Sequence, residues 1–310
     1  MSIIVENLTK KYGSQRAVDN ISFEVKTGEI VGFLGPNGAG KTTTMKIITC
    51  FMAPSDGDVK VGGHSIHNNQ EIIKKKIGYL PESNPLYYEM QILDYLRFVA
   101  ELQGVPKNKI ESRIIDMVRL TGLNDEKHKK IGELSKGYKQ RVGLAQAMIH
   151  DPEILILDEP TTGLDPNQIV EIRKLIRELG REKTVILSTH ILPEVEATCD
   201  RILIINKGKI VADGTSDLLK KQAQGEEVLK IQISEAESKD EVITSLQQLE
   251  NISLVDPITE SVNSYLVNSK VGSSSRKDIF QLCVNKNWVL TEMTPIETKL
   301  EDIFRQLTTN

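Results

Sequence analysis

A glycine-rich segment near the N-terminus has the residue types and spacing needed to bind phosphate groups. The segment GPNGAGKT spans residues 35–42 and follows the apolar run IVGFL. Its glycines permit backbone conformations that direct N–H groups toward an anion, and the helix expected after them adds its dipole. In loops of the form G-x-x-x-x-G-K-[ST], the lysine reaches the β- and γ-phosphates and the hydroxyl holds Mg²⁺. We therefore expect Lys41 and Thr42 to contact a nucleotide and its metal ion.

A second glycine-containing segment, LSKGYKQR at residues 134–141, does not repeat the first. It lacks the G-K-[ST] ending, and the preceding residues HKKIGEL are not a clear strand. A strand before the loop and a helix after it are the context that makes the phosphate-loop pattern specific. The segment is therefore not a second loop of the same type.

A pair of carboxylates follows the apolar run ILIL at residues 154–157. Asp158 lies at the end of this expected strand, where a carboxylate is a usual ligand for Mg²⁺. Glu159 follows it directly, and two adjacent carboxylates repel each other unless a cation is near. A lone Asp-Glu pair is common on protein surfaces, but beside a phosphate loop it suits a site where a water molecule needs a base.

The motif that GTPases use to recognise guanine is not present in its required form. That motif reads NKxD, and the nearest segment, Asn206–Lys209, has lysine where aspartate is required. Among proteins with a phosphate loop, an ATPase is therefore favoured over a GTPase.

Strands and helices alternate along the first two-thirds of the chain. Short β-branched runs predict strands, and apolar residues at helical spacing predict the segments between them. The expected strands are Ile3–Leu8, Ile21–Val25, Ile30–Leu34, Ile154–Leu157, Thr184–Leu187 and Arg201–Ile205. The expected helices are Lys41–Thr49, Met90–Gln103, Lys107–Leu120, a helix from LSKGY to His150, and Pro166–Leu179. This alternation indicates an α/β fold with a mainly parallel sheet covered by helices.

The pattern changes near Lys220, where the polar segment LLKKQAQGEE is expected to be a linker. Beyond it the expected order is β-α-β-β-α-β plus a final helix, which is a split βαβ arrangement. Its strands are expected at Val228–Ile233, Ile252–Ile258, Ser264–Val267 and Trp288–Thr291, and its helices at Lys239–Leu249, Arg276–Asn285 and Thr298–Leu307. The sequence thus predicts two domains, residues 1–222 and a small α+β accessory domain of ferredoxin-like order at 223–310.

Composition limits the class of partner and the compartment. The chain has 310 residues with a net charge of −4, which gives no indication of a nucleic-acid or anionic-membrane surface. Cys50, Cys199 and Cys283 lie far apart, so a reducing cytosol is expected. His64 and His67 lack further ligands at metal-binding spacing and are expected in a polar loop. No segment approaches the roughly 20 apolar residues that a spanning helix needs, so the chain is expected to be soluble by itself.

Together, the motifs of residues 1 to about 220 resemble those of the nucleotide-binding subunits of ATP-binding-cassette (ABC) transporters. In that family GPNGAGKT is the Walker A loop, ILILDE the Walker B strand and Gly163–Asp165 the D-loop, while LSKGYKQR falls where the LSGGQ signature stands. The resemblance implies a P-loop ABC ATPase domain, with a RecA-like core, a β subdomain and a helical subdomain.

The resemblance also implies the residues that bind and hydrolyse ATP. Glu159 would polarise the attacking water, while Lys41 and the switch histidine His190 would stabilise charge on the γ-phosphate. The ring of Tyr12 would stack on adenine. The remaining nucleotide contacts would come from the Walker A loop, namely Gly35, Pro36, Asn37, Gly38, Ala39, Gly40, Lys41, Thr42 and Thr43.

The implied Mg²⁺ site includes one departure from the family pattern. Thr42 and Asp158 match the usual positions, but Glu82 stands where the family usually has the Q-loop glutamine. A glutamate keeps an oxygen ligand for Mg²⁺ or water and adds a negative charge. We therefore expect Thr42, Glu82 and Asp158 to form the metal site.

The signature segment also departs from its family pattern. Lys136 and Tyr138 replace a glycine and a glutamine, whereas Ser135 and Gly137 remain. Phosphate binding is expected to survive, because it depends on a serine hydroxyl and backbone N–H groups at a helix start. By resemblance, Ser135, Gly137 and Asp165 would complete the ATP site of an opposing chain in a cassette dimer.

The resemblance implies an ATPase coupled to transport through separate membrane-spanning permease subunits. VGFLGPNGAGKTTTMKIIT, KKKIGYLPESNPLYYEM and the ending KLEDIFRQLT are similar to the gliding-motility-associated and drug-exporter types. Such a subunit would be cytoplasmic and bound to the inner face of the membrane through its permease, which would dock around Glu82 to Glu89. The alternative is a soluble ABC-type regulatory or structural ATPase acting on a ribosome or DNA.

Overall fold

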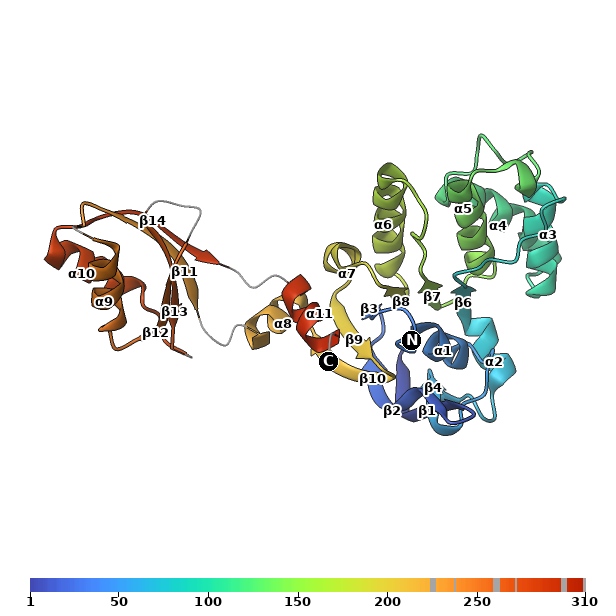
Figure 1. Ribbon diagram of the computed structural model, residues 1–310. Helices are drawn as coiled ribbons and strands as arrows, with labels where there is room; N and C mark the ends of the chain where they lie inside the picture. Colours follow the sequence, from blue (N-terminus) through green and yellow to red (C-terminus); the bar gives the residue numbers. More distant parts are fainter. Residues whose placement is uncertain (224–226, 237, 259–262, 271, 297–299, 309–310) are drawn as a thin grey trace. The chain divides into compact units, whose positions relative to one another are not determined.

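The structure, a computed structural model, describes residues 1–223, 227–236, 238–258, 263–270, 272–296 and 300–308 (Figure 1). The chain divides into two compact units. The first, here called the cassette unit, comprises Met1–Ser216 and Gln306–Asn310, and the second, the C-terminal unit, comprises Asp217–Arg305.

The cassette unit is built around a six-stranded sheet that is mainly parallel. In spatial order its strands are β10 (Lys209–Gly214), β9 (Arg201–Asn206), β3 (Ile30–Leu34), β8 (Thr184–Thr189), β7 (Ile154–Asp158) and β6 (Ile77–Leu80). All neighbours pair in parallel except β10, which runs antiparallel at one edge. Every residue of β3, β7 and β8 is buried, as expected for parallel strands with both faces covered. The predicted α/β class is confirmed.

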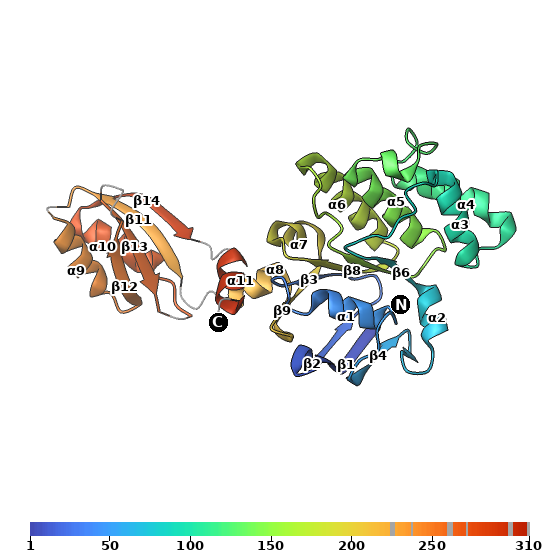
Figure 2. The same ribbon diagram turned by 45° about the vertical axis from the view of Figure 1, so that its right-hand side comes forward.

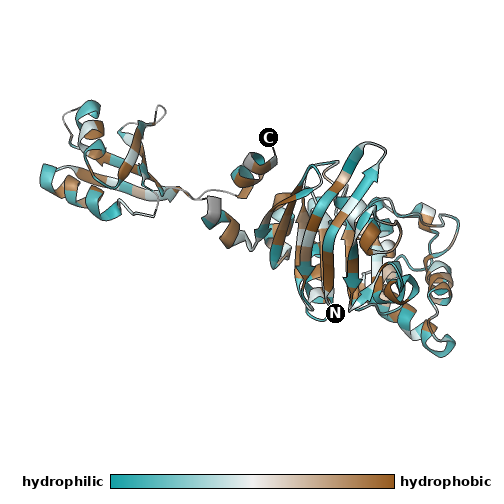
Figure 3. Cartoon of the chain, turned by 90° about the horizontal axis from the view of Figure 1, so that it is seen from below, coloured by the Kyte–Doolittle hydropathy of each residue, from teal (hydrophilic) through white to brown (hydrophobic). Residues whose placement is uncertain are grey.

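A second, antiparallel sheet forms the β subdomain of the cassette unit. Its strands in spatial order are β2 (Gln15–Val25), β1 (Ile3–Tyr12), β4 (Asp56–Val61) and β5 (His64–Ser65). Strands β1 and β2 form a hairpin longer than predicted, because pairing continues past the apolar residues to Tyr12 and Gln15. In β2 buried and exposed residues alternate, and Figure 3 shows brown and teal residues along the strands of this region.

Helices cover the six-stranded sheet and form a separate helical subdomain (Figure 2). Those of the cassette unit are α1 (Lys41–Ile48), α2 (Gln70–Lys76), α3 (Ile92–Leu102), α4 (Lys107–Leu120), α5 (Lys136–Met148), α6 (Pro166–Gly180) and α7 (Leu192–Thr198). Helices α3, α4 and α5 pack against one another and make up the helical subdomain. Among the described residues, none of the helices combines the length and apolarity needed to cross a membrane.

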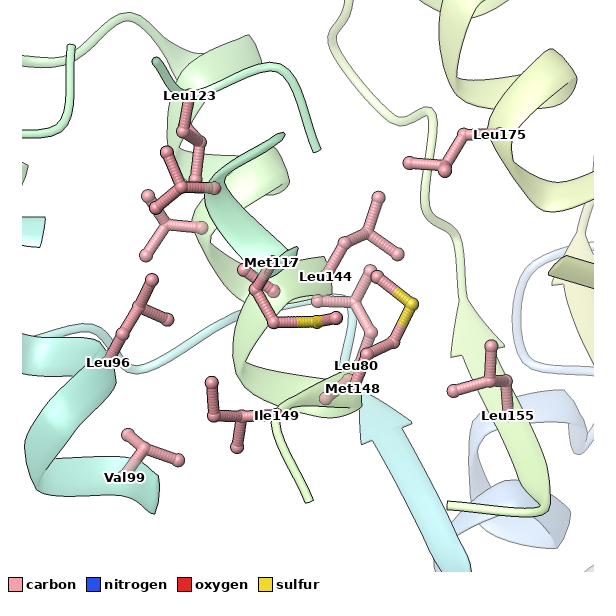
Figure 4. Close-up of a cluster of buried hydrophobic side chains, with 14 of the residues drawn as sticks. Leu80, Leu96, Val99, Met117, Leu123, Leu144, Met148, Ile149, Leu155 and Leu175 are labelled. Atoms are coloured by element: carbon pink, nitrogen blue, oxygen red, sulfur yellow. The ribbon is translucent and has the colours of Figure 1, made fainter. Parts of the chain in front are cut away.

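A continuous hydrophobic cluster joins the helical subdomain to the six-stranded sheet (Figure 4). Leu96 of α3 and Met117 of α4 belong to the same cluster as Leu144 of α5 and Leu155 of β7. Leu96, Leu144 and Leu155 are completely buried. Since interiors pack densely, this cluster fixes α5 relative to the sheet.

The C-terminal unit contains an antiparallel sheet with strand order β12-β13-β11-β14. Its strands are β11 (Val228–Ser234), β12 (Ile252–Pro257), β13 (Ser264–Ser269) and β14 (Val289–Ile296), and its helices include α9 (Lys239–Gln247) and α10 (Arg276–Lys286). Its core includes Ile231, Tyr265 and Trp288.

The borders between the units differ from the sequence-based expectation. The segment near Lys220 was predicted as a linker, but helix α8 (Ser216–Ala223) continues through it with Leu219 buried. Residues 224–226 of the predicted linker and residue 298, the predicted start of the last helix, lie outside the described residues. That helix, α11 (Leu300–Thr308), ends in the cassette unit, where Asn206 Nδ2 donates to the Leu307 carbonyl at 3.0 Å.

Candidate functional site

A cleft of about 560 Å³ opens at the carboxyl ends of the parallel strands. Strands β3, β8 and β7 are neighbours in the sheet, so the residues that follow them converge at one edge. In open α/β sheets this edge is where ligands bind. The residues lining the cleft are Tyr12, Gln15, Ala17, Asn37, Gly38, Gly40, Lys41, Thr42, Thr43, Glu82, Glu159, Thr162 and His190.

The glycine loop between β3 and α1 and the first turn of α1 form one wall of the cleft. Gly38 has a φ of 79° and Gly40 a φ of 110°, values in the region that favours glycine. A Cβ atom on Gly40 would lie 2.4 Å from the Ala17 carbonyl oxygen of the neighbouring hairpin. Gly40 thus lets the loop lie directly against the hairpin while it leads into α1.

Gly35 acts differently from the sequence-based expectation. Its N–H was predicted to face phosphate, but it lies 3.4 Å from the Thr189 carbonyl oxygen and bonds within the protein. The N–H of Ala39 likewise donates to the Pro36 carbonyl at 3.1 Å. A Cβ atom on Gly35 would lie 2.4 Å from the Ile205 carbonyl oxygen, so this glycine is required for space.

The lysine of the loop is held at the centre of the site. Lys41 Nζ donates to the Gly35 and Pro36 carbonyls at 2.8 Å and 3.3 Å, and the residue is 6% exposed. Its ammonium also lies 3.6 Å from Glu159 Oε1. The sequence motif alone did not indicate this contact between the loop lysine and the Walker B carboxylate.

Glu159 and His190 meet across adjacent strand ends. His190 Nδ1 lies 3.0 Å and 2.9 Å from the two carboxylate oxygens of Glu159. The Thr162 hydroxyl donates to Glu159 Oε2 at 3.2 Å. Glu159 is buried and has a φ of 51°, a conformation that is uncommon for a residue with a side chain. The structure therefore brings a predicted base and a predicted switch residue into direct contact.

Asp158 has the environment of a metal ligand. It is completely buried at the end of β7, where its Oδ1 accepts a short hydrogen bond from the Ser188 hydroxyl. Burial raises the pKa of its carboxyl, and the Ser188 hydrogen bond opposes that shift. Its Oδ2 atom is buried and has no hydrogen-bond partner among the described residues. A buried carboxylate oxygen without a hydrogen-bond partner, on a residue that lies beside the Thr42 hydroxyl, fits a hard cation such as Mg²⁺.

Tyr12 lies at the end of β1, on the rim of the cleft. Its hydroxyl donates to Met52 Sδ at 2.9 Å, and the Lys10 ammonium lies 5.6 Å from the ring centroid. The side chain is 47% exposed, so these contacts leave much of the ring open for stacking. Gln15 and Ala17 also line the cleft and were missed by the sequence analysis, although the glycine turn after Tyr12 signals the hairpin that places them there.

Thr162 and Glu82 lie on further loops at the cleft. Thr162 was also missed by the sequence analysis, although it stands three residues after Glu159 in the same loop. Glu82 lines the cleft from the loop after β6, and its side chain is exposed.

Ser135, Gly137 and Asp165 do not line the cleft of their own chain. Ser135 caps α5 by accepting from the Tyr138 N–H at 3.4 Å, and Asp165 caps α6 by accepting from the Gln168 N–H at 3.0 Å. A Cβ atom on Gly137 would lie 2.4 Å from Gln168 Oε1, so the two helix starts lie side by side. The three residues thus form a separate group on the cassette unit.

Comparison with known proteins places these features in one family. A sequence profile described as ABC transporter matches residues 18–162. The bacitracin transport ATP-binding protein BcrA of Bacillus licheniformis is 35% identical over 311 residues, covering 99% of this chain and 98% of that protein. The linearmycin resistance ATP-binding protein LnrL of Bacillus subtilis is 38% identical over 232 residues, covering 74% of each chain.

Solved structures give the same result for the fold of the cassette unit. The ATP-binding subunit of an ABC transporter is 32% identical with a TM-score of 0.66, covering 72% of this chain and 93% of that one. A dimeric post-hydrolysis state of the cassette MJ0796, bound to ADP and Pi, is 25% identical with a TM-score of 0.63, covering 69% of this chain and 98% of that one.

Proposed function

Because this chain belongs to the family of ABC transporter ATP-binding proteins, we propose that it is the ATP-hydrolysing subunit of a transporter that exports an antimicrobial compound. The observation that carries the proposal is the contact of Glu159, His190 and Lys41 in one cleft beside the glycine loop. Phosphoryl transfer from ATP needs a positioned base for water and cations on the γ-phosphate, and these side chains supply both.

In the proposed reaction, ATP lies in the cleft with its adenine against Tyr12 and its phosphates along the loop to Thr43. The Glu159 carboxylate accepts a proton from the attacking water. Lys41 and His190 stabilise the negative charge that develops on the γ-phosphate. In this step His190 moves its hydrogen bond from the Glu159 carboxylate to the phosphate. In the structure the base and the histidine are hydrogen-bonded to each other.

Thr42, Asp158 and Glu82 would hold Mg²⁺. The ion would neutralise charge on the β- and γ-phosphates. The orphaned Asp158 Oδ2 supports this assignment, since a buried carboxylate oxygen without a donor needs a cation or a water molecule.

We expect removal of Mg²⁺ to abolish hydrolysis, because the ion would neutralise charge on the β- and γ-phosphates during phosphoryl transfer. Phosphate release measured in excess EDTA should fall to background, and added MgCl₂ should restore it. Asp158→Asn should raise the MgCl₂ concentration needed for hydrolysis, whereas Asp116→Asn, at a half-exposed position of α4, should leave it unchanged. Full turnover in EDTA would exclude the metal assignment.

The active form is proposed to be a homodimer of cassettes with two shared ATP sites. The related cassette MJ0796 is a dimer in its solved structures. In the proposed dimer Ser135, Gly137 and Asp165 of one chain complete the cleft of the other. Their position outside the cleft of their own chain supports this arrangement. ATP binding closes the dimer and hydrolysis reopens it.

The proposed docking site for the membrane-spanning subunits is an aromatic surface on the helical subdomain. Tyr87, Tyr88, Met90 and Phe98 line a shallow hollow of about 450 Å³. Tyr87 and Tyr88 are 56% and 52% exposed, although large aromatic side chains usually lie inside. Their segment continues the loop that carries Glu82 into the ATP cleft. A partner seated here would therefore be linked by a few residues to the nucleotide.

We expect Tyr88→Ala to weaken binding of the membrane partner while ATP binding by the isolated chain stays unchanged. The Tyr88 ring is exposed, with the Lys139 ammonium 5.2 Å from its centroid, so its loss costs contact area and little stability. Copurification from detergent-solubilised membranes measures the effect. Ile115→Ala, at an apolar residue of α4 that is 66% exposed, is the control. Equal recovery of the partner with both variants would exclude this surface.

The same copurification tests the proposed function as a whole. Recovery of a polytopic membrane protein supports transport, and it would place the chain at the inner face of the membrane. Recovery of ribosomes or DNA in its place would support a regulatory ATPase. The bacitracin and linearmycin relatives favour an antimicrobial cargo over a motility-related role. Deletion of the gene should then sensitise the cell to such a compound and leave motility unchanged.

A further inference from the structure

Helix α7 carries a buried carboxylate that the proposed reaction does not use. Glu194 is 1% exposed and accepts hydrogen bonds from the Thr161 hydroxyl at 2.5 Å and from the Thr189 hydroxyl at 2.9 Å. Both of its carboxylate oxygens thus accept from hydroxyl groups and not from the cation of a lysine, arginine or histidine. Burying a carboxylate without a cation is costly, so its hydrogen bonds are needed to offset the lost hydration.

The two hydroxyls belong to the segments that carry the base and the switch histidine. Thr161 stands two residues after Glu159, in the loop that follows β7. Thr189 is the last residue of β8 and directly precedes His190. Glu194 therefore bridges the two loops, and it is not among the residues that line the cleft.

Local hydrogen bonds transmit this bridge to the reacting side chains. The Thr189 hydroxyl also accepts from the Ile191 N–H at 3.1 Å, which fixes the backbone on both sides of His190. The Glu194 N–H donates to the Ile191 carbonyl at 3.1 Å and closes the same turn. On the other loop, the Thr162 N–H donates to the Glu159 carbonyl at 3.2 Å, so Thr161 lies inside a closed turn with the base.

We propose that Glu194 is a positioning residue that holds Glu159 and His190 at the separation needed for hydrolysis. It touches no reacting atom and acts through Thr161 and Thr189. The inference rests on the proposed roles of Glu159 and His190. A misplacement of about 1 Å in a reacting group can cost about a hundredfold in rate, so loosening this bridge should lower kcat. ATP binding should be preserved, because the glycine loop does not contact Glu194.

The test is the near-isosteric substitution Thr161→Val, which removes one hydroxyl of the bridge and keeps its volume. We expect kcat to fall by about tenfold or more, with the Kd for ATP within about twofold of wild type. Thr198→Val is the matched control. Thr198 lies on α7, the helix that carries Glu194, and is 2% exposed. Its hydroxyl has no hydrogen-bond partner among the described residues. The control should keep wild-type kcat.

Glu194→Leu, alone and combined with Thr161→Val, tests whether the hydroxyl acts through the carboxylate. The kcat of the double variant should be no lower than the lower kcat of the two single variants, because both changes break the same bridge. Should Glu194→Leu not fold, the pair Thr161→Val and Thr198→Val still decides the matter.

Three results would overturn the proposal. The first is an unchanged kcat in Thr161→Val, and the second is a rise in its KM for ATP without a fall in kcat. The third is a lower Tm of this variant with an unchanged kcat. Each would reduce Glu194 to a packing or binding role. A failure of the proposed roles of Glu159 and His190 would be distinguishable from these results. It would appear as full hydrolysis by Glu159→Gln and His190→Ala, independently of the kcat of Thr161→Val.

Discussion

Glu159→Gln is expected to bind ATP with wild-type affinity and to lose about 10²- to 10⁴-fold in hydrolysis rate, the usual contribution of a general base. The amide keeps the shape of the carboxylate and can still bond to the Thr162 hydroxyl, but it cannot accept a proton from water. Removal of the charge also ends the ion pair with Lys41, which leaves that ammonium free for the phosphates.

Two measurements on the purified variant check this expectation. Phosphate release gives kcat, and equilibrium dialysis with ATP gives the Kd, so a loss of catalysis is separated from a loss of binding. Glu101→Gln, at an exposed position near the end of α3, is the control for the change in charge. Near-normal turnover of Glu159→Gln together with its partner would refute the assignment of the base.

The second large effect concerns the signature segment, and it distinguishes shared from self-contained ATP sites. A mixed dimer is prepared from one Lys41→Ala chain and one Ser135→Arg chain. If each ATP lies between the glycine loop of one chain and the signature of the other, both lesions fall in one site and the second site is intact. If each chain is self-contained, both sites are damaged.

Counting the nucleotides trapped by the purified mixed dimer decides between these arrangements. A non-hydrolysable ATP analogue is used, because turnover can be coupled between the two sites. We expect one trapped nucleotide per mixed dimer and none in either homodimer of the single variants, whose sites all carry a lesion. A mixed dimer that traps none would exclude the shared site and the proposed role of Ser135.

Much of the cassette fold could be predicted from short-range patterns. The strand Ile30–Leu34, the glycine loop and the helix from Lys41 are encoded within a few residues of one another, and the structure has them at the predicted place. Helix α4 has the predicted bounds, Lys107–Leu120, because its apolar residues repeat at helical spacing. Strand β4 was missed because its sequence DGDVKV is mainly polar, and its pairing with β1 depends on residues far away in the chain.

The order of residues by itself indicated which side chains could bind phosphate, which carboxylates could serve a metal and a base, and that an ATPase is favoured over a GTPase. Tertiary structure decided how those groups meet. Glu159 and His190 lie 31 residues apart in sequence, and Thr161 and Glu194 lie 33 apart. They come together because β7 and β8 are parallel neighbours whose carboxyl ends lie at one edge of the sheet. Strand order is set by the burial of whole strands between helices, so no short segment of sequence specifies it.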